Sequence, residues 1–123
     1  MKSSISMRAS ALESDFRSRG SERRSIAVSL ALRALRDLEG MGLRAWVIGS
    51  LARGRFTPTS DVDFAVDCPP EREHDAFRTI EKAMGAFPFH MIPRSRIAED
   101  AHPTMMEEAL DASGLVSRET QAR

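Results

Sequence analysis

The chain has 123 residues, of which 41% are hydrophobic and 29% are charged, as is typical of a globular protein with one domain. Its 18 basic and 18 acidic residues give a formal net charge of zero, so no overall field attracts nucleic acid. Cys68 is the only cysteine, which excludes an intramolecular disulfide. Because no apolar run could span a membrane or serve as a signal peptide, we expect a cytoplasmic protein.

Residues 1–24 are rich in serine and arginine and predict a polar N-terminal extension. Two interpretations stay open, a basic arm that touches a partner and a solvated terminal segment. Residues 25–39 predict an amphipathic helix that ends at the glycines after it. Its apolar positions recur at helical spacing and comprise Ala27, Leu30, Ala31, Ala34, Leu35 and Leu38.

The apolar run 43–48 predicts a central strand that is covered on both faces. Gly49 directly follows it and permits a tight turn, because glycine has no Cβ atom to clash. The residues after Gly49 can begin a short helix, whose free N–H groups could bind a phosphate. Residues 55–60 then predict a polar connection, long enough to form a flap over a substrate.

Asp61 and Asp63 lie at the start of a second strand, predicted over residues 61–66. Residues i and i+2 of a strand project from the same face, so the two carboxylates should stand side by side. Carboxylate pairs of this kind suit a hard cation such as Mg²⁺. The sequence therefore predicts a phosphate-binding turn and a metal-binding pair in one short stretch.

This stretch reads G-S-L-A-R-G, then five residues, then S-D-V-D. It resembles the signature of nucleotidyltransferases of the DNA polymerase beta type. The closest resemblance is to the minimal nucleotidyltransferases, many of which act as antitoxins beside HEPN-domain toxins. The residues that match the signature are Gly49, Ser50, Ala52, Arg53, Gly54, Ser60, Asp61 and Asp63.

The resemblance implies an α/β fold in which helices flank a small mixed sheet, with a nucleotidyltransferase domain over residues 25–116 and a polar tail over 117–123. It implies transfer of a nucleoside monophosphate, AMP from ATP, to a hydroxyl group on a partner toxin. Nucleic-acid and membrane partners are not expected.

By the same resemblance, Asp61 and Asp63 would be the catalytic residues and would hold one or two Mg²⁺ ions. The nucleotide would be bound by Gly49, Ser50, Arg53, Gly54 and Ser60. For Arg53, a salt bridge to either aspartate is an open alternative.

The second half of the chain predicts a helix over residues 71–84, a third strand over 87–92 and a last short helix over 103–110. Catalytic relatives usually carry a third carboxylate on this third strand, where the present chain has His90. Imidazole is a poor ligand for Mg²⁺. A second interpretation therefore stays open, a weakened nucleotide-binding module that neutralises a partner by direct binding.

Overall fold

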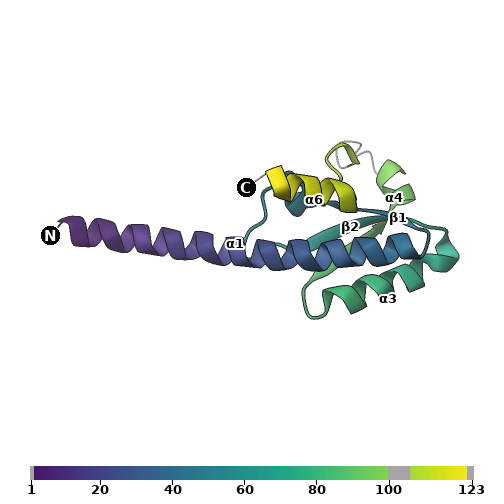
Figure 1. Cartoon of the computed structure of the whole chain (residues 1–123), viewed down its shortest axis with the longest axis horizontal. Coiled ribbons are helices and arrows are strands. Elements are labelled where there is room, and N and C mark those ends of the chain that lie inside the picture. The colour runs from purple at the N-terminus through teal and green to yellow at the C-terminus, as the bar shows by residue number, and fades with distance from the viewer. Residues whose placement is uncertain (1, 100–105, 122–123) are drawn as a thin grey trace.

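The computed structural model describes the backbone of residues 2–99 and 106–121 and shows a small sheet covered by helices (Figure 1). In chain order the elements are α1 (Lys2–Gly40), β1 (Arg44–Ile48), α2 (Gly49–Arg53), β2 (Val62–Asp67), a 3₁₀ turn (Pro70–Arg72), α3 (Glu73–Met84), β3 (Phe89–Pro93), α4 (Arg94–Glu99) and α6 (Ala112–Gln121). None of the helices in the described ranges is long and apolar enough to cross a membrane.

The sheet has three strands in the order β1-β2-β3. β1 pairs with β2 in antiparallel fashion, whereas β2 pairs with β3 in parallel. A parallel pair needs a long crossover connection, and α3 supplies it here. The predicted α/β class with a small mixed sheet is therefore confirmed.

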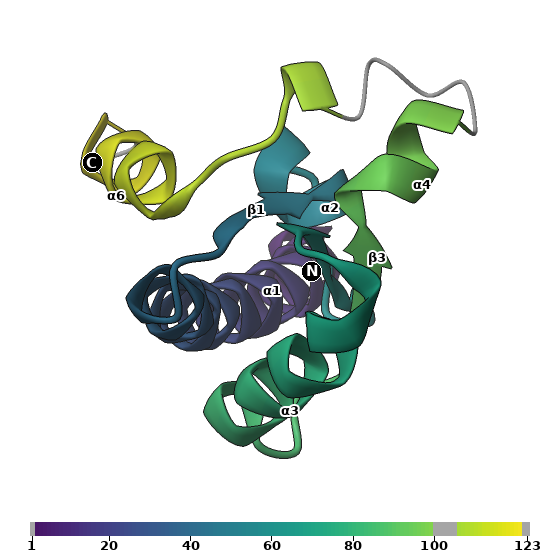
Figure 2. The ribbon, with the colours of Figure 1, turned by 90° about the vertical axis from the view of Figure 1, so that its right-hand side faces the viewer.

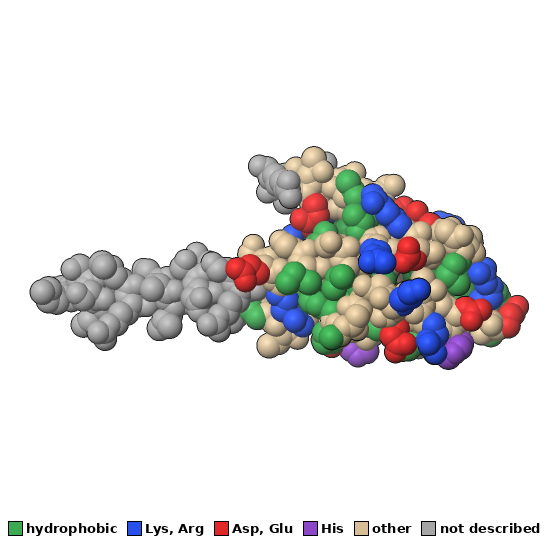
Figure 3. Space-filling model, turned by 60° about the horizontal axis from the view of Figure 1, so that its bottom comes forward, with side chains coloured by type: hydrophobic (Ala, Val, Ile, Leu, Met, Phe, Trp, Pro, Cys, Tyr) green, Lys and Arg blue, Asp and Glu red, His purple; other side chains and the backbone are tan. Residues whose placement is uncertain are grey.

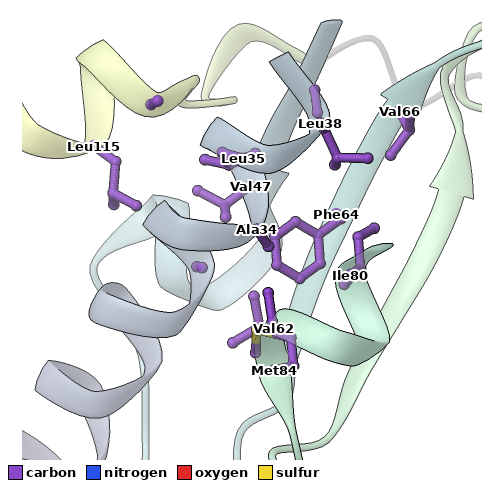
Figure 4. Close-up of a cluster of buried hydrophobic side chains, with 14 of the residues drawn as sticks. Ala34, Leu35, Leu38, Val47, Val62, Phe64, Val66, Ile80, Met84 and Leu115 are labelled. Carbon is purple, nitrogen blue, oxygen red and sulfur yellow. The ribbon is translucent and has the colours of Figure 1, made fainter. Parts of the chain in front are cut away.

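The main core lies between one face of the sheet and helices α1 and α3 (Figure 4). Phe64 of β2 is fully buried there, together with Leu35 and Leu38 of α1 and with Ile80 and Met84 of α3. The opposite face carries a much smaller cluster, whose buried members are Ile48, Ala65 and Ile97. Since β2 alternates between the faces, Asp61 and Asp63 fall on the face with the smaller cluster.

Helix α1 begins far earlier than the predicted helix over residues 25–39. The predicted apolar stripe is its buried side, and the preceding residues continue the same helix until it projects beyond the body of the molecule (Figure 1). Residues 2–24 contain no proline, and their one glycine, Gly20, lowers helix propensity by only about 1 kcal/mol. The expected boundary at residue 25 thus lies inside α1.

Helix α6 is an element that the sequence interpretation missed. The sequence predicts no element over residues 112–116 and a polar tail over 117–123, but Ala112 and Leu115 are buried and residues 117–121 are helical. Asp111 begins the helix, because its carboxylate accepts a 2.8 Å hydrogen bond from the N–H of Gly114. This capping aspartate was the available sequence signal.

The predicted short helix over residues 103–110 lies partly outside the described residues. Within the described part, Met106 and Glu107 are helical and Leu110 pairs with Val47 of β1. This segment crosses the sheet face that carries the smaller cluster, because Met106 and Ala109 pack against that cluster.

Candidate active site

Asp61 and Asp63 converge on the side chain of His90. Asp61 directly precedes β2, and Asp63 is the second residue of that strand. The parallel register places His90 of β3 opposite Asp63. The Nδ1 atom of His90 lies 3.2 Å from Asp63 Oδ1 and 3.9 Å from Asp61 Oδ2. The predicted carboxylate pair is thus brought together, with the imidazole as its third member.

The environment of Asp63 disfavours its ionised form. Burial of the carboxyl group raises the pKa of Asp63 above its ordinary value, and the nearby charge of Asp61 raises it further, while the hydrogen bond and charge of His90 oppose this. The net direction is upward because desolvation dominates. A cation bound beside the pair would offset this unfavourable charge.

Gly49 lies directly against the carboxylate of Asp63. It has φ of 72°, and a Cβ atom at this position would come within 2.6 Å of Asp63 Oδ2. The antiparallel register explains the contact, since Ile48 at the end of β1 is paired with Asp63. Gly49 therefore makes room for the carboxylate as well as permitting the turn into α2.

The residues after Gly49 form the short helix expected from the sequence. The buried side chains of Leu51 and Ala52 pack this helix against the core, and Ser50 in its first turn is half-buried. Gly54 ends the helix in the left-handed conformation, with φ of 74°. A Cβ atom on Gly54 would come within 2.5 Å of Arg118 Nη2, so α6 lies close to the end of α2.

Arg53 pairs with Glu108 rather than with Asp61 or Asp63. Its Nε atom lies 2.7 Å from Glu108 Oε2. Arg53 is in the last turn of α2, from which its side chain reaches the segment that leads to Leu110. The expected alternative, a salt bridge from Arg53 to Asp61 or Asp63, is therefore wrong. Glu108 was missed because the predicted helix over residues 103–110 does not reveal which part of the sheet or of α2 it contacts.

Ser60 lies in a hydrogen-bonded turn that is held by α1. Its Oγ atom accepts a 2.9 Å hydrogen bond from the N–H of Thr57. Its carbonyl oxygen accepts a 3.0 Å hydrogen bond from Arg23 Nη2. The guanidinium carbon of Arg23 also lies 4.3 Å from the ring centroid of Phe87. Arg23, which the sequence interpretation missed, thus ties together the segments that precede Asp61 and β3.

The donor set suits a magnesium ion that is shared with a substrate. In the part of the chain that the structure describes, no group of three or more His, Cys, Asp and Glu side chains is arranged to hold a metal ion. Protein-bound Mg²⁺, however, is commonly held by one or two carboxylates together with substrate phosphates. Asp61 and Asp63 converge beside a turn in which a Cβ atom would not fit, which agrees with that arrangement.

The chain was also compared with known proteins. A family model described as the nucleotidyltransferase domain matches residues 28–111, which is more than half of the chain. Searches of curated proteins and of solved structures found no significant match. The matched region includes the whole sheet, α2, α3 and the aspartate pair. The chain therefore belongs to the nucleotidyltransferase domain family.

Proposed function

We propose that this protein is a Mg²⁺-dependent nucleotidyltransferase that transfers AMP from ATP to a hydroxyl group on a partner protein. The observation that carries the proposal is the convergence of Asp61 and Asp63 beside Gly49. Family membership supports the general reaction. The resemblance to minimal nucleotidyltransferases supports a HEPN-type toxin as the acceptor.

In this reaction the acceptor oxygen forms a bond to the α-phosphorus of ATP. The bond from that phosphorus to the bridging oxygen of the β-phosphate breaks, and pyrophosphate leaves with the bonding electron pair. The hydroxyl proton passes to a carboxylate of the pair or to water. Mg²⁺ held by Asp61 and Asp63 would offset the negative charge on the phosphates. Ser50 and the backbone N–H groups after Gly49 would bind the outgoing phosphates.

Metal-dependent nucleotide binding tests the first part of this proposal. Titration calorimetry should show ATP binding with Mg²⁺ and at least about tenfold weaker binding without it, because triphosphate and carboxylates repel each other. Asp61→Asn and Asp63→Asn should lose the effect of Mg²⁺. Asp67→Asn is the matched control, because Asp67 is an exposed aspartate on the same strand. Equal binding with and without Mg²⁺ in every protein would refute the metal site.

A second function, neutralisation of a partner by binding alone, is favoured by His90. This residue is opposite Asp63, on the strand where catalytic relatives carry a carboxylate, and its side chain is 66% exposed. Transfer of label from α-³²P-ATP to a co-purified partner separates the two functions. Slow transfer that His90→Asp accelerates would indicate a weakened enzyme. Partner binding without transfer by any variant would support the binding module.

A further inference from the structure

Arg53 and Glu108 form an ion pair at one end of β1. The Nε atom of Arg53 lies 2.7 Å from Glu108 Oε2, and the two side chains are 39% and 53% exposed. Among the residues that the structure describes, neither side chain forms a salt bridge with any other residue. Exposed ion pairs of this kind contribute little to stability. An anion from solvent can therefore reach the pair and open it without disturbing the fold.

Glu108 lies toward the same end of β1 as the turn at Gly49. Val47 and Leu110 exchange backbone hydrogen bonds of 2.8 and 3.0 Å in an antiparallel bridge. Glu108 comes two residues before Leu110 and Gly49 comes two residues after Val47, so an antiparallel arrangement brings them to the same end. Figure 2 shows this part of the chain passing over β1 and α2 on its way to α6. A carboxylate is thus held near the turn that adjoins the aspartate site.

The side chain of Arg53 leans toward the same turn. Residues four apart in a helix share a face, and helical side chains tilt toward the N-terminus of the helix. Arg53 follows Gly49 by four residues on α2, and its contact with Glu108 agrees with this direction. Gly49 in turn lies against the carboxylate of Asp63. Arg53 is therefore the basic side chain of α2 that leans toward the aspartate site, and Glu108 occupies it.

We propose that Glu108 competes with the phosphates of the nucleotide for Arg53, so that this ion pair opens when the nucleotide binds. The inference rests on the proposed function, because it requires phosphates beside Asp61 and Asp63. A guanidinium group binds phosphate oxygens through the same N–H donors that bind a carboxylate. A triphosphate offers more charge and more oxygens than one exposed carboxylate, so it displaces Glu108. When pyrophosphate leaves, Glu108 returns to Arg53 and thereby favours its release.

Substitution of Glu108 tests the competition. The probes are ATP and inorganic tripolyphosphate, each with Mg²⁺, and titration calorimetry measures their dissociation constants. Glu108→Gln should bind both probes at least about threefold more tightly than wild type, because Arg53 no longer has an anionic partner. Unchanged binding would overturn the inference. Weaker binding would also overturn it, since Glu108 would then be positioning Arg53 for the phosphates.

A second exposed arginine–glutamate pair provides the matched control. Arg78 Nε lies 3.4 Å from Glu81 Oε1 within α3, and the two side chains are 66% and 52% exposed. Helix α3 covers the sheet face opposite the aspartates, and Figure 3 shows basic and acidic side chains intermixed on that side of the molecule. Glu81→Gln removes the same charge and should leave both dissociation constants unchanged. Equal tightening in Glu81→Gln and Glu108→Gln would reduce the effect to net charge and would overturn the inference.

A double substitution tests whether Glu108 acts through Arg53. Arg53→Gln should weaken the binding of both probes at least about fivefold, because a charged hydrogen bond to phosphate is lost. Adding Glu108→Gln to Arg53→Gln should then have a much smaller effect than Glu108→Gln alone has in wild type. Tightening of the same size in both backgrounds would show that Glu108 repels the phosphates directly, and the competition for Arg53 would be wrong.

Label transfer separates this inference from the proposed function. Tighter binding by Glu108→Gln, with no transfer of label from α-³²P-ATP to a co-purified partner, would retain the competition and contradict the enzyme. Transfer by wild type, with unchanged binding in Glu108→Gln, would retain the enzyme and overturn the competition. No binding of either probe by wild type or by Glu108→Gln would contradict both.

Discussion

At the scale of single residues, Gly49 combines a left-handed backbone with close contact to the carboxylate of Asp63. Any Cβ atom there would be strained by the φ of 72° and would also approach Asp63 Oδ2 to 2.6 Å. Gly42 has nearly the same backbone, with φ of 78°, but nothing lies within 4 Å of its Cβ position. Substitutions at the two glycines should therefore share the effect of backbone strain, whereas only a substitution at Gly49 also affects the contact with Asp63.

We expect Gly49→Ala and Gly42→Ala to lower the free energy of unfolding by a similar amount, about 1–2 kcal/mol, because both place alanine in the left-handed region. Only Gly49→Ala should also weaken Mg²⁺-dependent ATP binding, since it displaces the Asp63 carboxylate. Urea denaturation and titration calorimetry measure the two effects. Nucleotide binding that falls equally in both variants would show that the contact with Asp63 is unimportant.

The raised pKa of Asp63 has a consequence for stability. A carboxyl group with a higher pKa in the folded state binds its proton more tightly when folded. The stabilising contribution of Asp63 to the free energy of unfolding is therefore fully present below its ordinary pKa of 3.8. This contribution is lost as pH rises through the raised pKa of the folded state. At neutral pH the ionised carboxylate thus destabilises the fold.

We expect Asp63→Asn to be more stable than wild type at neutral pH, although it loses the proposed metal ligand. The difference between the two proteins should be small below the ordinary pKa of 3.8 and should grow as pH rises through the raised pKa of Asp63. Denaturation with urea across this pH range is the measurement, and Asp67→Asn, on the exposed part of β2, is the control. A difference that does not change with pH would contradict the proposed effect of burial.

At the scale of elements, α1 supports the candidate active site through Arg23. The hydrogen bond from Arg23 to the Ser60 carbonyl and its position over the Phe87 ring connect three segments of the chain. Phe56 extends this contact, with its ring centroid 6.2 Å from that of Phe87. Helix α1 is therefore part of the site's support, although it contributes no residue to the aspartate pair.

We expect Arg23→Ala to lower the free energy of unfolding by about 1–3 kcal/mol, from loss of a charged hydrogen bond and a cation–π contact. Amide hydrogen exchange should also become faster in residues 57–61, because the Ser60 carbonyl loses its partner. Arg33→Ala, at an exposed position of the same helix, should change neither quantity appreciably. If exchange in 57–61 is unchanged in Arg23→Ala, then Arg23 does not hold this segment.

At the scale of the whole molecule, α6 belongs to the same core as the sheet. The family match ends at residue 111, immediately before α6 begins. Leu115 is nevertheless only 1% exposed and joins the cluster between the sheet and α1 (Figure 4). Glu119 also forms a salt bridge with Arg24 of α1. The packed core therefore extends beyond the region that the family model matches.

We expect Leu115→Ala to lower the free energy of unfolding by about 2–5 kcal/mol, as is usual for a truncated core leucine. Val116→Ala is the matched control on the same helix, because Val116 is 39% exposed, and it should change stability by less than about 1 kcal/mol. Both proteins should unfold in one transition by circular dichroism. Equal effects of the two substitutions would show that α6 is not part of the core.

Much of the fold could be predicted because its signals are local. The strand before Gly49, the short helix after it and the helix that ends before Gly85 follow from periodicity and from glycine positions. The true start of α1 and the existence of α6 could not be obtained in this way. The stretches that precede and follow the predicted domain are polar and have weak periodicity, so they predict an extension and a tail where the structure has helices.

By itself, the sequence determined that Asp61 and Asp63 share one face beside a glycine turn, because strand alternation and short spacing place them there. Only the tertiary structure decided that His90 lies opposite Asp63 and that Gly49 lies against its carboxylate. It also decided that Arg53 pairs with Glu108. These contacts join segments that meet only through strand register and the path of the chain over the sheet, and no local pattern in the sequence specifies them.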